Sequence, residues 1–152
     1  MAAGNIYYPR VVAKLRRTTT QSIAVSGTWT AINFDAEDAD NYGGHDNSTN
    51  PDRYTVPKTS TYVVLGSGDF ASNSTGMRGV RFTVNGSSVP SSMVTPTVNG
   101  DLWSGSIGTI MSLTAGDIVR VEVLQTSGGA LNANANAPGF ACTLALAEQV
   151  AL

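Results

Sequence analysis

The chain contains one histidine and one cysteine, so the side chains that most often carry catalysis are scarce. His45 lies among glycine, aspartate and asparagine, although acid–base catalysis at neutral pH usually recruits histidine. Cys142 lies on an alternating segment beside leucines, where a buried, inert thiol is the more common situation than a nucleophile. The sequence has no nucleophile elbow, no zinc-ligand spacing and no glycine loop followed by lysine for phosphate. We therefore expect no enzymatic activity and no cofactor.

An acidic run at residues 35–52 is the second place to look for chemistry, because it contains six carboxylates and no lysine or arginine. Asp38 and Asp40, followed by Tyr42 and Gly43, resemble the start of a calcium-binding loop. The run lacks the third oxygen ligand at the next odd position and the distal glutamate of such loops. Asp38 and Asp40 are thus weak metal-ligand candidates, and the alternative is a solvated loop without a metal.

A basic, partly apolar N-terminal segment precedes the acidic run, and residues 1–34 hold four bases and no acid. Such a segment can dock on another subunit or on a larger acidic surface, because it offers apolar burial and charge complementarity together. The alternative is a frayed terminus followed by an ordinary edge strand. The docking hypothesis predicts an anchoring arm made of Ile6, Tyr7, Tyr8, Arg10, Lys14, Arg16 and Arg17.

Composition excludes several classes of protein. Charged residues are 13% of the chain, about half the usual share. Few lysines and glutamates argue against a helical bundle, and a net charge of −2 argues against disorder. A sequence pI near 5.1 argues against nucleic-acid binding by charge. The longest uncharged stretch, 123–147, is broken by glycine, asparagine and proline, so we expect no membrane span and find no secretory signal.

Alternation of apolar and polar residues predicts β-strands throughout the chain. Thr61–Leu65 is apolar on both faces, which is typical of a strand buried on both sides. Glycine- and asparagine-rich turns separate the runs, among them Asn85-Gly86, which predicts a tight hairpin, and residues 35–52 read as one long loop. We predict eight to ten short strands in one all-β, antiparallel sandwich or jelly roll. The predicted organisation is an N-terminal arm and first strand at 1–17, a jelly-roll domain at 18–147 and a short C-terminal tail at 148–152.

Several segments, in the same order along the chain, resemble the globular head of complement component 1q, whose family shares the tumour-necrosis-factor jelly roll. They are Gly27–Asp35, Tyr54–Pro57 with Tyr62, Val80–Gly86, Leu113–Val121, and Phe140 with Leu144. The chain has no collagen-like repeat, which removes the stalk of the animal proteins. Further segments are similar to heads found in tailed-bacteriophage virion proteins: Asp69–Asn73, Gly76–Arg81 and Leu124–Leu131.

The resemblance implies a homotrimer around a threefold axis, and on this basis Tyr62 and Phe140 are candidates for residues near that axis. It also implies a virion protein: a capsid decoration, or cement, protein that binds the assembled shell through its arm and stabilises it. The expected partners are further copies of itself and the major capsid protein or another virion protein, with no nucleic acid and no membrane. One alternative is a tail-tip or fibre head that recognises a host surface glycan or protein. A glycan hydrolase using the acidic run is a further, poorly supported alternative.

Overall fold

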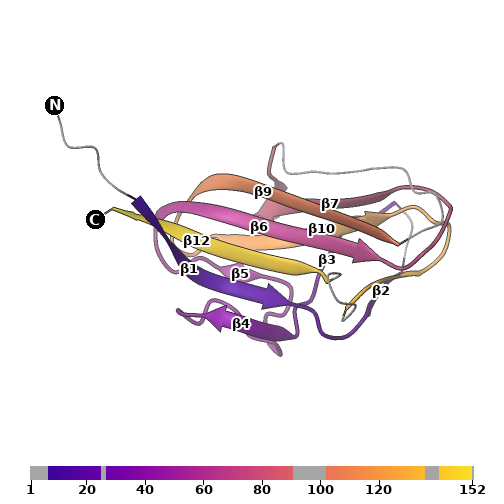
Figure 1. Cartoon of the computed structure of the whole chain (residues 1–152), viewed down its shortest axis with the longest axis horizontal. Helices are drawn as coiled ribbons and strands as arrows, with labels where there is room; N and C mark the ends of the chain where they lie inside the picture. The colour runs from indigo at the N-terminus through magenta and orange to yellow at the C-terminus, as the bar shows by residue number, and fades with distance from the viewer. Residues whose placement is uncertain (1–6, 25–26, 91–101, 136–140, 152) are drawn as a thin grey trace.

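The computed structural model describes residues 7–24, 27–90, 102–135 and 141–151, and in this part every regular element is a β-strand (Figure 1). All strand pairs in it are antiparallel. The same residues contain no helix that is long and apolar enough to cross a membrane. The strands are β1 (Tyr7–Arg16), β2 (Gln21–Ile23), β3 (Thr30–Ala31), β4 (Ala36–Asp40), β5 (Tyr54–Thr55), β6 (Ser60–Phe70), β7 (Arg78–Val84), β8 (Ser87–Ser88), β9 (Trp103–Leu113), β10 (Ile118–Gln125), β11 (Leu131–Ala133) and β12 (Thr143–Ala151).

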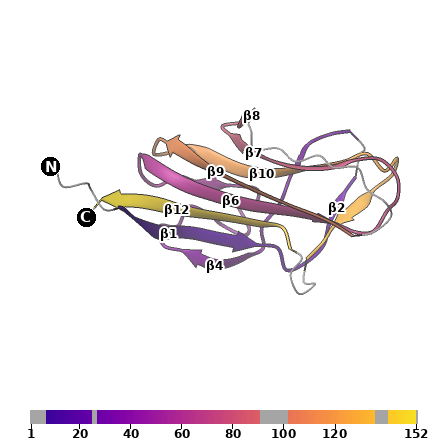
Figure 2. The same ribbon diagram turned by 45° about the horizontal axis from the view of Figure 1, so that its top comes forward.

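The strands form two sheets that pack as a sandwich. The larger sheet has seven strands in the order β2-β11-β6-β12-β1-β4, with β9 paired to β6. Figure 1 shows its long strands side by side, from β9 through β6, β12 and β1 to β4. The smaller sheet has five strands, β3-β10-β7-β8 with β5 paired to β10, and Figure 2 shows β7, β8 and β10 rising behind the larger sheet. The predicted all-β jelly-roll architecture is confirmed.

The core lies between the two sheets, because every second side chain along a strand points inward and most of these inward side chains are apolar. On β10, Val119, Val121 and Val123 are fully buried, as their spacing in the sequence predicts. The sheets approach closely at Gly66 of β6, where an added Cβ would lie 2.7 Å from Cε1 of Phe82 on β7. Glycine is required there because even a methyl group would meet the ring opposite.

Alternation alone gives the wrong inward face at the start of β1. It predicts that Val11, Ala13 and Leu15 share a face, but Val11 is exposed whereas Val12, Ala13 and Leu15 are fully buried. The pairing of β1 with β12 shifts register between Val11 and Ala13. A β-bulge inserts one residue and reverses the side of everything before it, so Val11 is turned to the outer face.

Two segment boundaries also differ from expectation. The run at 35–52 contains a strand, β4, which pairs with β1 over Ala13–Arg16. At the other end, β12 continues to Ala151, so most of the predicted tail at 148–152 belongs to a strand. Pairing with β1 in the larger sheet extends both segments beyond what local sequence indicates, since ladder hydrogen bonds outweigh weak β-propensity. The described residues form twelve strands, in place of the eight to ten that the sequence predicts.

The predicted turn at Asn85-Gly86 is confirmed. Both residues have positive φ, 50° and 81°, and the flanking strands pair at Val84 and Ser87. This is the geometry that Asn-Gly favours in two-residue hairpins. The Asn85 side chain also donates a 2.8 Å hydrogen bond to Asp117, so it ties two neighbouring turns together.

Candidate functional site

His45 and Cys142, the single histidine and the single cysteine, are both buried within the fold. The ring of His45 is buried, with Nδ1 2.9 Å from the carbonyl oxygen of Arg53 and Nε2 3.1 Å from Oδ1 of Asn47. Cys142 is fully buried, and burial raises the pKa of its thiol to about 12. At neutral pH this thiol is protonated, and a thiol of that kind is a poor nucleophile.

The two weak metal-ligand candidates serve different purposes. Asp38 lies 2.8 Å from Nε of Arg16 and 3.3 Å from Nζ of Lys14, and these hydrogen bonds hold its pKa below the usual range. Asp40 accepts hydrogen bonds from the backbone N–H groups of Gly44 and His45, at 3.2 and 2.9 Å. In the described ranges no three His, Cys, Asp or Glu residues gather as metal ligands. Calcium binding by Asp38 and Asp40 stays an untested alternative to the expectation of no metal.

The basic and acidic segments contact each other within one chain, because β1 and β4 are neighbours in the larger sheet. Besides the contacts of Asp38, Arg17 lies 3.7 Å from Asp35, and its side chain is largely buried. Arg10 places its guanidinium 5.5 Å from the ring centre of Tyr42. Bases of residues 1–34 and acids of residues 35–52 therefore form ion pairs with each other inside one protomer.

The other residues of the predicted arm are described unequally. Ile6 lies outside the described residues, and Tyr7 and Tyr8 are described only as the first two residues of β1. From Tyr7 onward the segment is a strand between β12 and β4, with Leu15 in the core. Anchoring by this segment remains a prediction.

Tyr62, one of the two candidates for the threefold axis, belongs to the core of the protomer. Its side chain is fully buried between the sheets, and its hydroxyl donates a 2.6 Å hydrogen bond to the carbonyl oxygen of Lys58. A side chain with no accessible surface in the single protomer contributes to the core, and the nearness of Tyr62 to a threefold axis stays an untested prediction. The other axis candidate, Phe140, lies outside the described residues.

The outer face of the larger sheet carries three exposed, large aliphatic side chains. Leu65 on β6, Ile110 on β9 and Val11 on β1 point away from the core and are 54%, 63% and 52% exposed. Strand register places Ile110, Val63, Ala147 and Val11 in one row across four neighbouring strands. Leu65 lies in the next row, opposite Ala145. We call these six residues the apolar face.

A shallow groove of about 160 Å³ runs along the apolar face between β1, β12 and β6. Its walls include Val11, Val63, Leu65, Ala145 and Ala147, and Lys14 is the charged residue among its lining. Small alanines on β12 between larger residues on the neighbouring strands create this depression. A surface of this shape accepts aliphatic side chains from outside.

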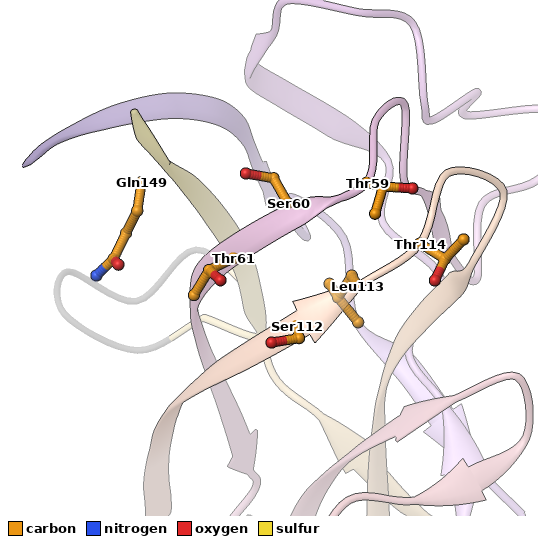
Figure 3. A pocket seen from close by; sticks show the side chains of 7 residues that line it. All are labelled: Thr59, Ser60, Thr61, Ser112, Leu113, Thr114 and Gln149. Carbon is orange, nitrogen blue, oxygen red and sulfur yellow. The ribbon is translucent and has the colours of Figure 1, made fainter. Parts of the chain in front are cut away.

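A larger, polar hollow of about 590 Å³ adjoins the apolar face at the end of β6 and β9 (Figure 3). It is lined by hydroxyl groups, one amide and one aliphatic side chain: Thr59, Ser60, Thr61, Ser112, Thr114, Gln149 and Leu113. Ser112 pairs with Thr61 in the β6–β9 ladder, so their side chains share a face. The lining carries no charge and suits neutral hydrogen-bonding groups.

The outer face of the smaller sheet is built differently. Asp52 accepts hydrogen bonds from Arg53 and Arg120, both at 2.7 Å. Glu122 accepts from Arg81 on the neighbouring strand at 2.6 Å, and the Arg81 guanidinium lies 4.4 Å from the ring centre of Trp29. Burial acts to raise the pKa of Asp52, but the two arginines outweigh it and the pKa is lowered. Here opposite charges pair within the protomer.

Sequence reasoning missed the apolar face. The available signal is the segment Thr61–Leu65, which is apolar on both faces and by its pattern predicts a strand buried on both sides. In the protomer only one of these faces is covered, with Tyr62 and Val64 buried and Leu65 half exposed. The bulge in β1 brings Val11 to the same surface, which the alternation pattern could not reveal.

Among known proteins, the solved structures that resemble this chain share one fold. No protein-family model matches the chain, and no curated protein matches its sequence. Among solved structures, murine APRIL at pH 5.0 superposes with a TM-score of 0.64 at 15% identity, covering 91% of this chain and 98% of the other. The Eiger TNF of S. frugiperda gives 0.61 at 11% identity, with coverages of 91% and 92%. The globular domain of zebrafish complement 1qA gives 0.58 at 13%, with coverages of 91% and 94%. At these identities the likeness establishes the fold, which is that of the tumour-necrosis-factor-like jelly roll.

Proposed function

We propose that the chain is a non-catalytic structural module that self-associates into a homotrimer through the apolar face. The observation that carries this proposal is the concentration of half-exposed aliphatic residues there, on a molecule whose other sheet is faced with ion pairs. Completing the burial of a half-exposed leucine, isoleucine or valine contributes roughly 1 kcal/mol. Three such residues on each of three protomers provide a substantial driving force for association.

Association leaves few unpaired charges behind. Lys14, on the border of the groove, already pairs with Asp38 within the protomer, so a neighbour need not supply a counterion. The remaining border consists of small hydroxyl-bearing residues such as Thr61 and Ser112, which can exchange water for hydrogen bonds across an interface.

For the biological role we propose a bacteriophage capsid decoration protein that binds the assembled shell and stabilises it. The similarity of three sequence segments to tailed-phage virion heads supports this role. The position of the chain ends supports it too, since Tyr7 pairs with Ala151 at one end of the sandwich. An arm attached at that end reaches a shell while the opposite loops face outward. Binding to the assembled shell but not to its dissociated parts stabilises the shell by mass action.

A second candidate role is a tail-tip or fibre head that recognises a host surface glycan or protein. The hydroxyl-lined hollow of Figure 3 favours it, because neutral hydrogen-bonding side chains suit a polyhydroxyl ligand. Among the described residues no aromatic side chain lines the hollow to stack on a sugar ring, so this role is the second candidate.

Two measurements test the proposal. The mass of the purified protein in solution should be three times 15.8 kDa, and a monomer at high concentration contradicts trimerisation. Imaging of particles carrying labelled protein should place many copies on the capsid, whereas a few copies at the tail support the second candidate.

The anchoring arm is best tested by removing residues 1–6 alone. Removing residues 1–17 would delete β1, with Val12, Ala13 and Leu15, from its place between β12 and β4 in the larger sheet and so unfold the domain. The shorter truncation should weaken particle binding and leave the trimer intact. Unchanged decoration by the truncated protein contradicts an anchor in residues 1–6.

A further inference from the structure

The hairpin turn at Asn85-Gly86 carries a chemically labile amide group. Asparagine is one of the thermally labile residues, and a following glycine has no side chain to hinder attack by its backbone nitrogen on the asparagine side chain. An added Cβ at Gly86 would have no described atom within 4 Å, and both residues are exposed. Water and the attacking nitrogen therefore both have access to the Asn85 side chain.

The folded structure holds the Asn85 side chain away from this reaction. Its Nδ2 donates a 2.8 Å hydrogen bond to Oδ1 of Asp117, and its Oδ1 accepts a 2.9 Å bond from the backbone N–H of Ile118. We call these two hydrogen bonds the Asn85 clamp. Because both ends of the amide are bound at the start of β10, the side chain must leave the clamp before its Cγ can reach the nitrogen of Gly86.

Asp117, the acceptor in the clamp, is itself held in place by other contacts. Its Oδ2 accepts a 2.8 Å hydrogen bond from the backbone N–H of Thr114, and its carbonyl oxygen accepts one of 2.8 Å from Val56. Hydrogen bonds from Thr114 and Asn85 lower the pKa of the Asp117 carboxyl group, so it is ionised near neutral pH. The Asn85 amide thus donates to a carboxylate, and such a hydrogen bond is stronger than one between neutral groups.

We propose that Asn85 is a deamidation site, that the Asn85 clamp sets the rate of the reaction, and that the modification separates the two turns. The nitrogen of Gly86 forms a bond to Cγ of Asn85, the bond from Cγ to Nδ2 breaks, and ammonia leaves with the proton of the Gly86 nitrogen. Water then opens the five-membered ring at either carbonyl group and leaves aspartate or isoaspartate. The net reaction converts one amide and one water to one carboxylate and one ammonium ion.

The product of this reaction cannot restore the clamp. A carboxylate at position 85 has no hydrogen to donate, so a second negative charge faces Asp117 where an amide lay 2.8 Å away. Isoaspartate also adds a carbon to the backbone of the turn, which disrupts the two-residue hairpin that joins Val84 to Ser87. We therefore expect the β7–β8 hairpin to detach from the turn between β9 and β10.

The first experiment compares the folded protein with a synthetic peptide of residues 81–90, which has the same Asn-Gly pair without the clamp. Both are kept near pH 7, and peptide mapping by mass spectrometry follows Asn85 separately from the other Asn-Gly pair, Asn99-Gly100, which lies outside the described residues. Asn85 should convert at least about tenfold more slowly in the folded protein, because the clamp must open first. Equal rates, or no conversion in the peptide, contradict the proposal.

The second experiment removes the acceptor of the clamp. In Asp117→Ala, Asn85 should convert about tenfold faster than in the unmodified protein. The matched control is Asp46→Ala, which removes a carboxylate that binds the backbone of Ser48 and Thr49 in a different turn and should leave the rate unchanged. Asp117→Ser, which keeps an acceptor near the Thr114 N–H, replaces Asp117→Ala if that variant fails to fold. An unchanged rate, or equal acceleration by the control, overturns the role of the clamp.

The third experiment tests what the modification does. Asn85→Asp introduces the product carboxylate and should unfold at a lower urea concentration near pH 7, with faster hydrogen exchange at the N–H groups of Thr114 and Ile118. The control is Asn85→Gly, which removes the amide without adding charge and suits the positive φ of this position. An aspartate variant that is as stable as the glycine variant overturns the proposed separation of the turns by charge.

Discussion

The two outer faces of the sandwich differ in the side chains that they present to solvent. On the smaller sheet, outward positions hold arginines and carboxylates that pair across strands, as Arg81 does with Glu122. On the larger sheet, outward positions hold Leu65, Ile110 and Val11, and the ion pairs of Asp38 with Lys14 and Arg16 lie to one side, where β1 meets β4. A sheet face with paired charges is stable in water, whereas an apolar one gains free energy when something covers it. This contrast is the reason why we propose the larger sheet as the interacting side.

The largest effect should come from placing charge on the apolar face. Leu65→Glu with Ile110→Glu should weaken self-association about 100-fold or more, since buried carboxylates without partners oppose association. Sedimentation over a range of concentrations measures this change. The control is Met77→Glu, which alters another exposed apolar residue away from this face and should leave the oligomer unchanged. An unaltered oligomer in the double variant would remove the apolar face from the interface.

Removing the central carboxylate of the smaller sheet should act on folding and not on association. Asp52→Ala leaves Arg53 and Arg120 without their shared acceptor. We expect the free energy of unfolding in urea to fall by about 1–2 kcal/mol, because both groups are partly buried. The oligomeric state should not change. A shift in oligomeric state would show that the smaller sheet also takes part in the interface.

The two sheets should also differ in the pH dependence of stability. Asp52 has a lowered pKa, so its contribution is present above the unfolded value of 3.8 and is lost as pH falls through and below it. Asp69 on β6 is fully buried, and burial raises its pKa against the effect of a hydrogen bond from Asn134. Its contribution runs the other way: stability falls as pH rises from 3.8 through the raised value.

Asp69→Asn isolates this second component. Asparagine keeps an oxygen to accept the hydrogen bond from Asn134 but cannot ionise, so the variant should be more stable than the parent protein near pH 7 by about 1 kcal/mol. Urea titrations at pH 4 and pH 7 measure the difference, which should shrink at the lower pH. A variant that is less stable at both values would indicate that the Asp69 carboxylate is well accommodated.

The smallest effect belongs to the exposed ion pair beside the groove. Lys14→Ala removes a contact of 3.3 Å with Asp38 whose lysine side chain is 60% exposed. Solvent screens such a pair, so thermal unfolding should show no measurable change. A clear loss of stability would mean that the charges where β1 meets β4 matter more than those of the smaller sheet.

The sequence predicts the strands correctly where the packing of side chains follows the alternation of apolar and polar residues. β7, β10 and the Asn85-Gly86 turn lie where the sequence predicts them, because alternate residues face the core and the turn needs residues that tolerate positive φ. β4 could not be predicted from the sequence, because a segment of sequence AEDAD becomes a strand only by pairing with β1. The bulge near Val12 was likewise hidden, because it depends on the register against β12.

The sequence by itself determined the class of the fold, the scarcity of catalytic side chains and the separation of basic and acidic segments. Only the tertiary structure decided where these segments meet and which residues face outward. The physical reason is that composition and alternation act residue by residue, whereas register, sheet order and coverage depend on which distant strand lies alongside. Thr61–Leu65 reads as doubly buried in sequence, and the fold covers one of its faces and leaves the other as the apolar surface.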